Sequence, residues 1–147
     1  MNNPCIQFNF LEPISLADRN RLKRFLISLF KRHKKPLSEL QYIFCSDAWL
    51  LDINRQFLNH DYYTDIITFN LAEKGQPINA EIYISVDRVR ENARDFDSTL
   101  RKELHRVIFH GALHLCGFKD KSKKEAEQMR KMEEKWLDGY DCFTWNS

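Results

Sequence analysis

The chain has 147 residues, of which 43% are hydrophobic and 13% aromatic; this is enough for one packed core and too much for a largely disordered protein. With only four glycines and four prolines, a low-complexity or loop-dominated chain is excluded. The formal net charge of +2 does not indicate nucleic-acid binding by itself, so any basic surface must come from local clustering.

The N-terminus and the cysteines bear on the cellular compartment. The opening MNNPCIQFNF lacks the basic start and long apolar run of a signal peptide, and no later segment is apolar for long enough to span a bilayer. The cysteines are far apart and form no C-x-x-C pair, which favours buried free thiols over disulfides. They are Cys5, Cys45, Cys116 and Cys142. We therefore expect a soluble, cytoplasmic protein without membrane contact.

The N-terminal part of the chain predicts a strand followed by a helix. CIQFNF alternates as a half-buried strand does, which places Ile6, Phe8 and Phe10 on one face. A helix is expected from Ser15, with Asp18 as its capping-box partner, to a point before Pro36. Its apolar face, at helical spacing, consists of Leu22, Phe25, Leu26, Leu29 and Phe30.

The remaining elements predict the fold class. LQYIFCS predicts a second strand, and Ser46 can cap a helix with the apolar stripe Trp49, Leu50, Ile53 and Phe57. TDIITFNL and INAEIYIS are β-branched runs that predict a hairpin across AEKGQP. Helices are expected at about 86–96, at about 99–116 and at 122–139, the last with the capping box of Ser122 and Glu125. This order, with no linker or repeat, predicts one α+β domain (residues 1–147) with a mixed sheet of about four strands and about five helices.

The segment HGALHLCGFKD, from His110 to Asp120, predicts a metal site. Residues four apart lie on one face of a helix, so His110 and His114 can present two imidazoles to one ion. Gly117 can adopt the left-handed conformation that ends a helix, which would bring Asp120 back as a third ligand. The alternative is a buried helix with structural histidines; two histidines, a glycine and a carboxylate at these offsets favour the metal site.

The same offsets occur in zinc metalloproteases, where a glutamate directly after the first histidine is the general base. Here that position is Gly111, which has no side chain, so proteolysis by this route is disfavoured. His105 precedes His110 by five residues and falls off the shared helix face, so we interpret it as an ordinary residue.

At these residues the chain resembles the YbeY family of metal-dependent, single-strand-specific endoribonucleases. The family signature H-G-x-L-H-L-x-G-[YF]-x-H is matched by HGALHLCGF. INRQFLNHDYYTDIITF, from Ile53 to Phe69, is similar to the family's L-N-x-x-Y-R-x-x-D-x-x-T-D-V-L-S-F, and AEIYIS stands where the family has G-D-I-x-I-S. The order of elements and the length also agree, so the resemblance covers nearly the whole chain.

The resemblance implies an endoribonuclease that hydrolyses RNA phosphodiesters in small-subunit ribosomal RNA processing and in ribosome quality control. One Zn²⁺ would be held by His110, His114 and Asp120, to polarise a phosphoryl oxygen and activate a bound water. The implied partners are single-stranded RNA, ribosomal RNA or the ribosome, together with ribosomal proteins or assembly GTPases. The alternative is a ribosome-assembly factor with a mainly structural metal and little catalysis.

Two residues depart from the family pattern. Asp120 replaces the third histidine; a carboxylate makes the ion a weaker Lewis acid, and another divalent metal such as manganese or magnesium becomes the alternative to zinc. Leu58 replaces an arginine that is suited to grip the scissile phosphate. Arg55, His60 or Arg106 are the candidates to substitute for it.

The sequence alone does not identify the catalytic residues. Glu81, at the family's acidic position, and Arg106 are candidates, against structural roles for both. Thr64 and Asp65 match the family's T-D and either orient the site or start a strand. Basic residues that could approach RNA are Arg88, Arg90, Lys119 and Lys121, although interleaved acids also fit ordinary solvated helix faces.

Overall fold

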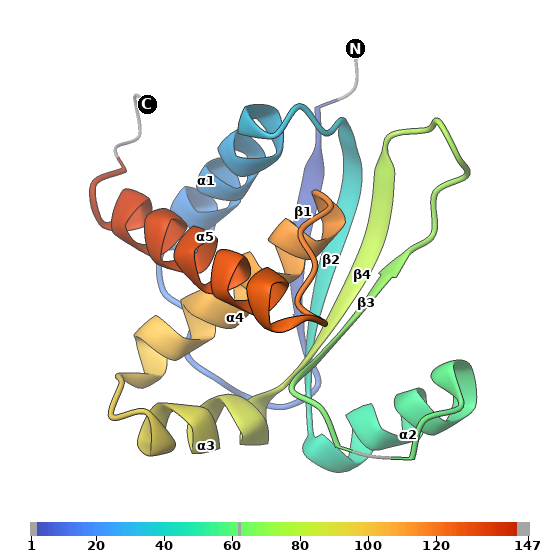
Figure 1. The fold of residues 1–147 in the computed structure, drawn as a ribbon, viewed down its shortest axis with the longest axis vertical. Helices are drawn as coiled ribbons and strands as arrows, with labels where there is room; N and C mark the ends of the chain where they lie inside the picture. The colour runs from blue at the N-terminus through green and yellow to red at the C-terminus, as the bar shows by residue number, and fades with distance from the viewer. Residues whose placement is uncertain (1–2, 62, 144–147) are drawn as a thin grey trace.

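The structure is a computed structural model that describes residues 3–61 and 63–143 (Figure 1). Its elements in chain order are β1 (Cys5–Phe10), α1 (Arg19–Arg32), β2 (Leu37–Cys45), α2 (Asp47–Leu58), β3 (Ile66–Asn70), β4 (Ile78–Ser85), α3 (Val86–Asp95), α4 (Leu100–Leu115) and α5 (Lys123–Asp141). The sheet order is β1-β2-β4-β3; β1 and β4 run parallel to β2, and β3 is antiparallel to β4. The predicted α+β class, with a four-stranded mixed sheet and five helices in the described ranges, is confirmed, as is the hairpin.

The two faces of the sheet are covered differently. Helices α1, α4 and α5 pack over one face and build the main core with β-strand residues such as Leu40 and Ile82 (Figure 1). Inside this core the Tyr42 hydroxyl donates to the Ile108 carbonyl over 2.8 Å, which ties β2 to α4. Helix α2 covers part of the opposite face through a smaller apolar cluster that includes Leu50 and Ile53.

Helix α4 crosses the sheet at very short range, and Gly111 is the reason. A Cβ atom at Gly111 would lie 2.9 Å from Cδ1 of Ile82 and 3.0 Å from Cδ1 of Ile66, so these two side chains would have to shift to make room for it. Glycine therefore lets the helix backbone lie near β4 and the edge strand β3 without displacing these side chains. The end of α4 that carries His110 and His114 is thereby held beside β3.

The first helix begins at Arg19, so the predicted start at Ser15 was wrong. Asp18 is the N-cap residue, but it has a φ of 54° and its side chain makes no capping hydrogen bond. Ile14 and Leu16 are both buried, and this two-residue spacing anchors an extended segment rather than a helical turn. The predicted apolar face of α1 is buried as expected. At the other end of the chain, α5 continues past Gly139 to Asp141.

Two further predictions hold only in part. Ser46 caps α2 as expected, and Leu50 and Ile53 are buried, but Trp49 and Phe57 are 45% and 68% exposed because only one side of α2 meets the sheet. All four cysteines are free thiols, as predicted. Cys45 and Cys116 are buried, whereas Cys5 and Cys142, beside the two chain ends, are exposed. Across the described residues, none of the helices is long and apolar enough to cross a membrane.

His105 is a buried histidine of the core. It is 5% exposed, and the Tyr140 ring meets it edge-on at a centroid distance of 5.0 Å. Burial lowers the pKa of His105 to about 4. The surrounding charges partly cancel; Arg101 and Arg21 lower the pKa, while Asp141 and Asp18 raise it.

This histidine should make the fold acid-sensitive. Because the pKa is about 6.5 in the unfolded chain and lower in the folded protein, the stability is intact above that value and falls as the pH drops towards about 4. Between about pH 7.5 and about pH 4.5, the wild type should lose about 2 kcal/mol more free energy of unfolding than His105→Phe. Urea denaturation at the two pH values measures this; parallel losses in the two proteins would contradict it.

Candidate metal centre

The structure brings His110, His114 and Asp120 together. The two histidines lie one turn apart on α4, and the chain turns back at Gly117, which has a φ of 105°. Nε2 of His110 is 3.2 Å from Oδ2 of Asp120, and Nε2 of His114 is 3.4 Å from the same oxygen. The three potential ligand atoms all lie within 4.8 Å of one another. The sequence pattern thus becomes one compact cluster.

Capped helix ends hold Asp120 in place. At the end of α4, the Phe118 N–H donates to the Leu113 carbonyl over 3.1 Å and the Gly117 N–H donates to the His114 carbonyl over 3.0 Å, the pairing of a Schellman motif. At the start of α5, Ser122 and Glu125 form the predicted capping box. Asp120 sits in the short connection between these two ends, so its backbone position is set by its neighbours.

The spacing of the cluster fits one divalent ion. Ligand atoms that lie about 2.0–2.2 Å from a tetrahedral ion are about 3.3–3.5 Å from each other, close to the 3.2 Å and 3.4 Å between the histidine nitrogens and Asp120. A direct histidine–carboxylate hydrogen bond is shorter, about 2.7–2.9 Å. Two imidazoles and one carboxylate are also a donor set that zinc accepts at catalytic sites. These residues could therefore hold a metal.

A fourth residue, Glu133 on α5, contacts the cluster from behind and was missed in the sequence. Its Oε2 lies 2.6 Å from Nδ1 of His110, and the residue is only 5% exposed. The sequence pattern could have identified Glu133, because this residue falls in the buried stripe of α5 between Met129 and Leu137. A carboxylate at a position where the helix period demands an apolar residue indicates a buried partner.

Further charged groups surround the cluster. Burial lowers the pKa of His110, but the hydrogen bond to Glu133 and the negative charges of Glu133, Asp65 and Asp120 outweigh burial and raise the pKa of His110 above its usual value. Burial raises the pKa of Asp65, which the charge of His110 opposes. Asp65, directly before β3, and His110 therefore influence each other's pKa by their charges.

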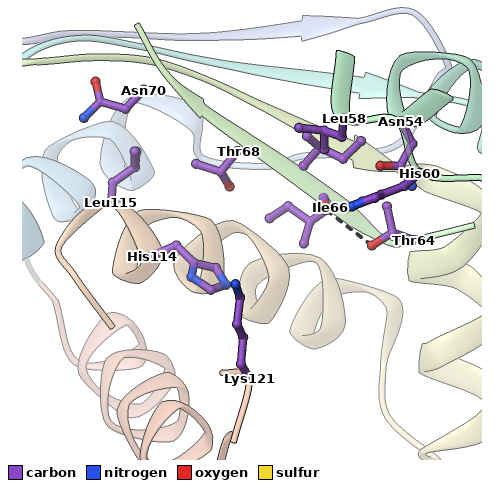
Figure 2. A pocket seen from close by; sticks show the side chains of 11 residues that line it. Asn54, Leu58, His60, Thr64, Ile66, Thr68, Asn70, His114, Leu115 and Lys121 are labelled. Atoms are coloured by element: carbon purple, nitrogen blue, oxygen red, sulfur yellow. Dashed lines mark hydrogen bonds between the residues drawn. The ribbon is translucent and has the colours of Figure 1, made fainter. Parts of the chain in front are cut away.

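A cleft opens beside His114. It has a volume of about 640 Å³ and lies between α4, the edge strand β3 and the C-terminal end of α2 (Figure 2). Its lining includes Asn54, Leu58, His60, Thr64, Ile66, Thr68, Asn70, His114 and Lys121. Figure 2 shows Lys121 beside the His114 ring, with Thr68 and Ile66 projecting from β3. Leu58, at the position of the family arginine, contributes an apolar surface to this cleft.

The structure does not bring either catalytic candidate to the reacting side of the cluster. Glu81 alternates with the core residues Ile82 and Ala80 along β4, so it faces the side of α2, and it accepts a hydrogen bond from the Tyr83 hydroxyl over 3.0 Å. Arg106 lies one turn before His110 and is engaged by carboxylates of Glu103, Glu133 and Glu134. The positive charge of Arg106 is therefore paired with carboxylates inside the protein.

The basic candidates for RNA contact are also separated. Lys121 lines the cleft, whereas Lys119 lines a different hollow, on the side of Cys116 and Glu125. On α3, Arg88 pairs with Asp47 at 3.1 Å, and Arg90 donates to the Pro13 carbonyl over 3.2 Å. Neither lines the cleft. The other two of the three candidates to substitute for the arginine, besides Arg106, differ likewise: His60 lines the cleft, and Arg55 pairs with Asp61 in solvent.

Comparisons with known proteins point to one family. The family model described as Endoribonuclease YbeY matches residues 13–141. Endoribonuclease YbeY of Cytophaga hutchinsonii is 51% identical over 119 residues, covering 81% of this chain and 83% of the relative. The protein of the same name from Porphyromonas gingivalis W83 is 48% identical over 130 residues, 87% and 85% of the two chains. The solution structure of TM1509 from Thermotoga maritima matches with a TM-score of 0.57 at 30% identity, over 94% of this chain and 92% of the other.

Proposed function

The chain belongs to the endoribonuclease YbeY family, and from that premise we propose that it cuts single-stranded RNA during ribosomal RNA maturation with a divalent metal ion held by His110, His114 and Asp120. The observation that carries the proposal is the convergence of three ligand atoms within 4.8 Å at the wall of a cleft of about 640 Å³. A cleft of this size is in the range of about 300–1,000 Å³ that holds small ligands.

The residues at the cleft would have different roles in RNA cleavage. A bound ion would supply Lewis-acid polarisation of a phosphoryl oxygen and a bound water of lowered pKa. His114 is the ligand that faces the cleft, so substrate would approach on its side. Lys121 places a positive charge where a phosphate would lie, and the hydroxyls of Thr64 and Thr68 offer hydrogen bonds to phosphate or ribose.

The metal proposed is one Zn²⁺. The donor set of two imidazoles and a carboxylate suits zinc, while the carboxylate of Asp120 makes manganese or magnesium the alternative. The arginine position is more consequential, because Leu58 offers no charge to a phosphate. His60 and Lys121 are the cleft residues that can compensate, and Arg106 is not proposed for this role because its carboxylate partners hold it.

The wider role follows the family likeness. Residues 1–147 would form one endoribonuclease domain that acts in the cytoplasm on ribosomal RNA of the small subunit or on the ribosome, with a part in ribosome quality control. Ribosomal proteins or assembly GTPases would be its protein partners. The second candidate function is a ribosome-assembly factor with a structural metal and little catalysis, and the observation that favours it is the apolar Leu58 in the cleft.

Chelation tests the proposal. Protein purified without chelators is expected to cut a single-stranded RNA, to lose at least about 90% of that activity after dialysis against EDTA, and to regain it with about one equivalent of zinc or manganese. The same sequence in a duplex should be cut at least about tenfold more slowly. Cleavage that survives EDTA would contradict metal-dependent catalysis. Stoichiometric metal without cleavage would favour the assembly function.

A further inference from the structure

We infer that Glu133 is a positioning residue for the metal site: it fixes the ring orientation and tautomer of His110, and Arg106 fixes Glu133. The inference rests on the proposed function, because it assumes that His110 is a metal ligand. Neither residue would touch the substrate or the ion. Their part is to prepare His110 for binding before the ion arrives.

The contact between the two residues determines the tautomer of His110. A neutral imidazole carries one N–H, and an ionised carboxylate can only accept a hydrogen bond. The 2.6 Å contact between Nδ1 of His110 and Oε2 of Glu133 therefore places the proton on Nδ1. The lone pair is left on Nε2, the nitrogen that lies 3.2 Å from Asp120. This is the tautomer that ligation through Nε2 requires, and a second hydrogen bond of this kind also orients the ring.

Arg106 gives the Glu133 carboxylate a second, separate anchor. Its Nη1 lies 3.2 Å from Oε1 of Glu133, so each carboxylate oxygen has its own partner, the arginine on one side and His110 on the other. The side chains of Arg106 and Glu133 are 12% and 6% exposed. Since α4 supplies the arginine and the histidine while α5 supplies the glutamate, the arrangement locks the two helices at the height of the metal site.

The position of Arg106 is itself fixed by two more carboxylates. Its Nε lies 3.4 Å from Glu103, and its Nη2 lies 2.6 Å from Glu134. The guanidinium of Arg106 thus faces three carboxylates, and a second guanidinium, that of the more exposed Arg130, lies 3.9 Å from Oε1 of Glu133.

His114 has no equivalent support, which makes the two histidines unequal. In the part of the chain that the structure describes, no carboxylate is hydrogen-bonded to its Nδ1, and its side chain is more exposed than that of His110, 28% against 18%. His110 is the prearranged ligand on the closed side of the site, and His114 is the adaptable ligand on the cleft side.

Zinc titration of Glu133→Gln and Glu133→Ala tests the role. Glu133→Ala should bind zinc about 10–100-fold more weakly, the loss typical of a removed outer partner. Glu133→Gln should lose less, since its amide oxygen can still accept from Nδ1–H. The matched control is Glu134→Gln, which removes the charge of a neighbouring partner of the same Arg106 without touching His110; its zinc affinity should stay within about twofold of the wild type.

The tautomer of His110 provides a readout that needs neither metal nor activity. In ¹⁵N NMR spectra of the metal-free protein, recorded at a pH high enough for His110 to be neutral, His110 should be the Nδ1–H tautomer in the wild type and in Glu134→Gln, and should shift towards Nε2–H in Glu133→Ala. If Glu133→Ala does not fold, Glu133→Gln, which keeps the shape of the side chain, decides by its zinc affinity. Wild-type zinc affinity together with an unchanged His110 tautomer in Glu133→Ala would overturn the inference, as would equal losses of zinc affinity in Glu133→Ala and Glu134→Gln. Where only Glu133→Gln folds, wild-type zinc affinity in that variant overturns it.

The outcomes separate this inference from the proposed function. A wild type that binds zinc as described, with the Glu133 dependence, but cuts no RNA would contradict the endoribonuclease proposal alone. A wild type that cuts RNA with metal, but whose Glu133 variants bind zinc normally, would contradict the positioning role alone.

Discussion

Replacing His114 with alanine is expected to remove bound metal and to lower the rate of single-stranded RNA cleavage at least about 100-fold. The substitution deletes one of three ligand atoms and leaves only His110 and Asp120, too few for a stable site. It also deletes the ligand that lines the cleft. Metal content of purified protein and the initial rate of cleavage are the two measurements.

The control for this substitution is His105→Phe, which changes another histidine of the same helix outside the cluster. That variant should keep about one metal ion per chain and a cleavage rate within about twofold of the wild type near neutral pH. If His114→Ala retained both the metal and the rate, the cluster would not be the metal site and the activity would belong to a contaminant. If only the metal were lost, the ion would be structural.

Gly111→Glu, which creates the H-E-x-x-H pattern of the metalloproteases, is expected to destabilise the fold by at least about 4 kcal/mol. The new Cβ would overlap the side chains of Ile82 and Ile66 at 2.9–3.0 Å, a strain of about 1–3 kcal/mol. Its carboxylate would point into an apolar layer, which adds several kcal/mol unless the group is neutralised. The close packing of α4 on the sheet therefore disfavours any glutamate at position 111, the position of the general base in the metalloproteases.

Gly139→Glu is the matched control for Gly111→Glu. Gly139 lies in α5 and is exposed, and a Cβ there would meet only ordinary contact with Phe25 at 3.5 Å. This variant should be as stable as the wild type or about 0.5–1 kcal/mol more stable, because glutamate has the higher helix propensity. Urea unfolding of the two variants compares them directly. Similar midpoints would show that α4 can move away from the sheet at little cost.

Local patterns were sufficient for most of the fold and for the candidate ligands. Hydrophobic periodicity located the strands and helices, and the four-residue spacing of His110 and His114 with a glycine turn placed Asp120 correctly beside them. These features depend on residues close together in sequence. The start of α1 failed for the same reason: Ser15 and Asp18 resemble a local helix cap, but burial of Ile14 in the tertiary structure keeps this segment extended.

The outer layer of the site could not be predicted in this way. The contact of Glu133 with His110 spans 23 residues and exists only because α5 folds back across α4. Glu81 illustrates the converse. It matched a family position by sequence, yet strand alternation directs it away from α4, since its neighbour Ile82 is the residue that packs under Gly111. A charged residue's role is set by the face it occupies, which sequence position alone does not reveal.

In the connection between α4 and α5, the shape of the backbone and the chemical type of the side chain at position 120 depend on different residues. Its shape depends on Gly117 and on the Ser122 cap, and not on the residue at position 120, whose side chain is 39% exposed. A donor of another chemical type can be exchanged at this point without repacking the interior. If the cluster holds a metal ion as proposed, the two histidines would be its constant ligands and the side chain at position 120 would adjust which ion is preferred, so one codon change would alter the metal preference of the same scaffold.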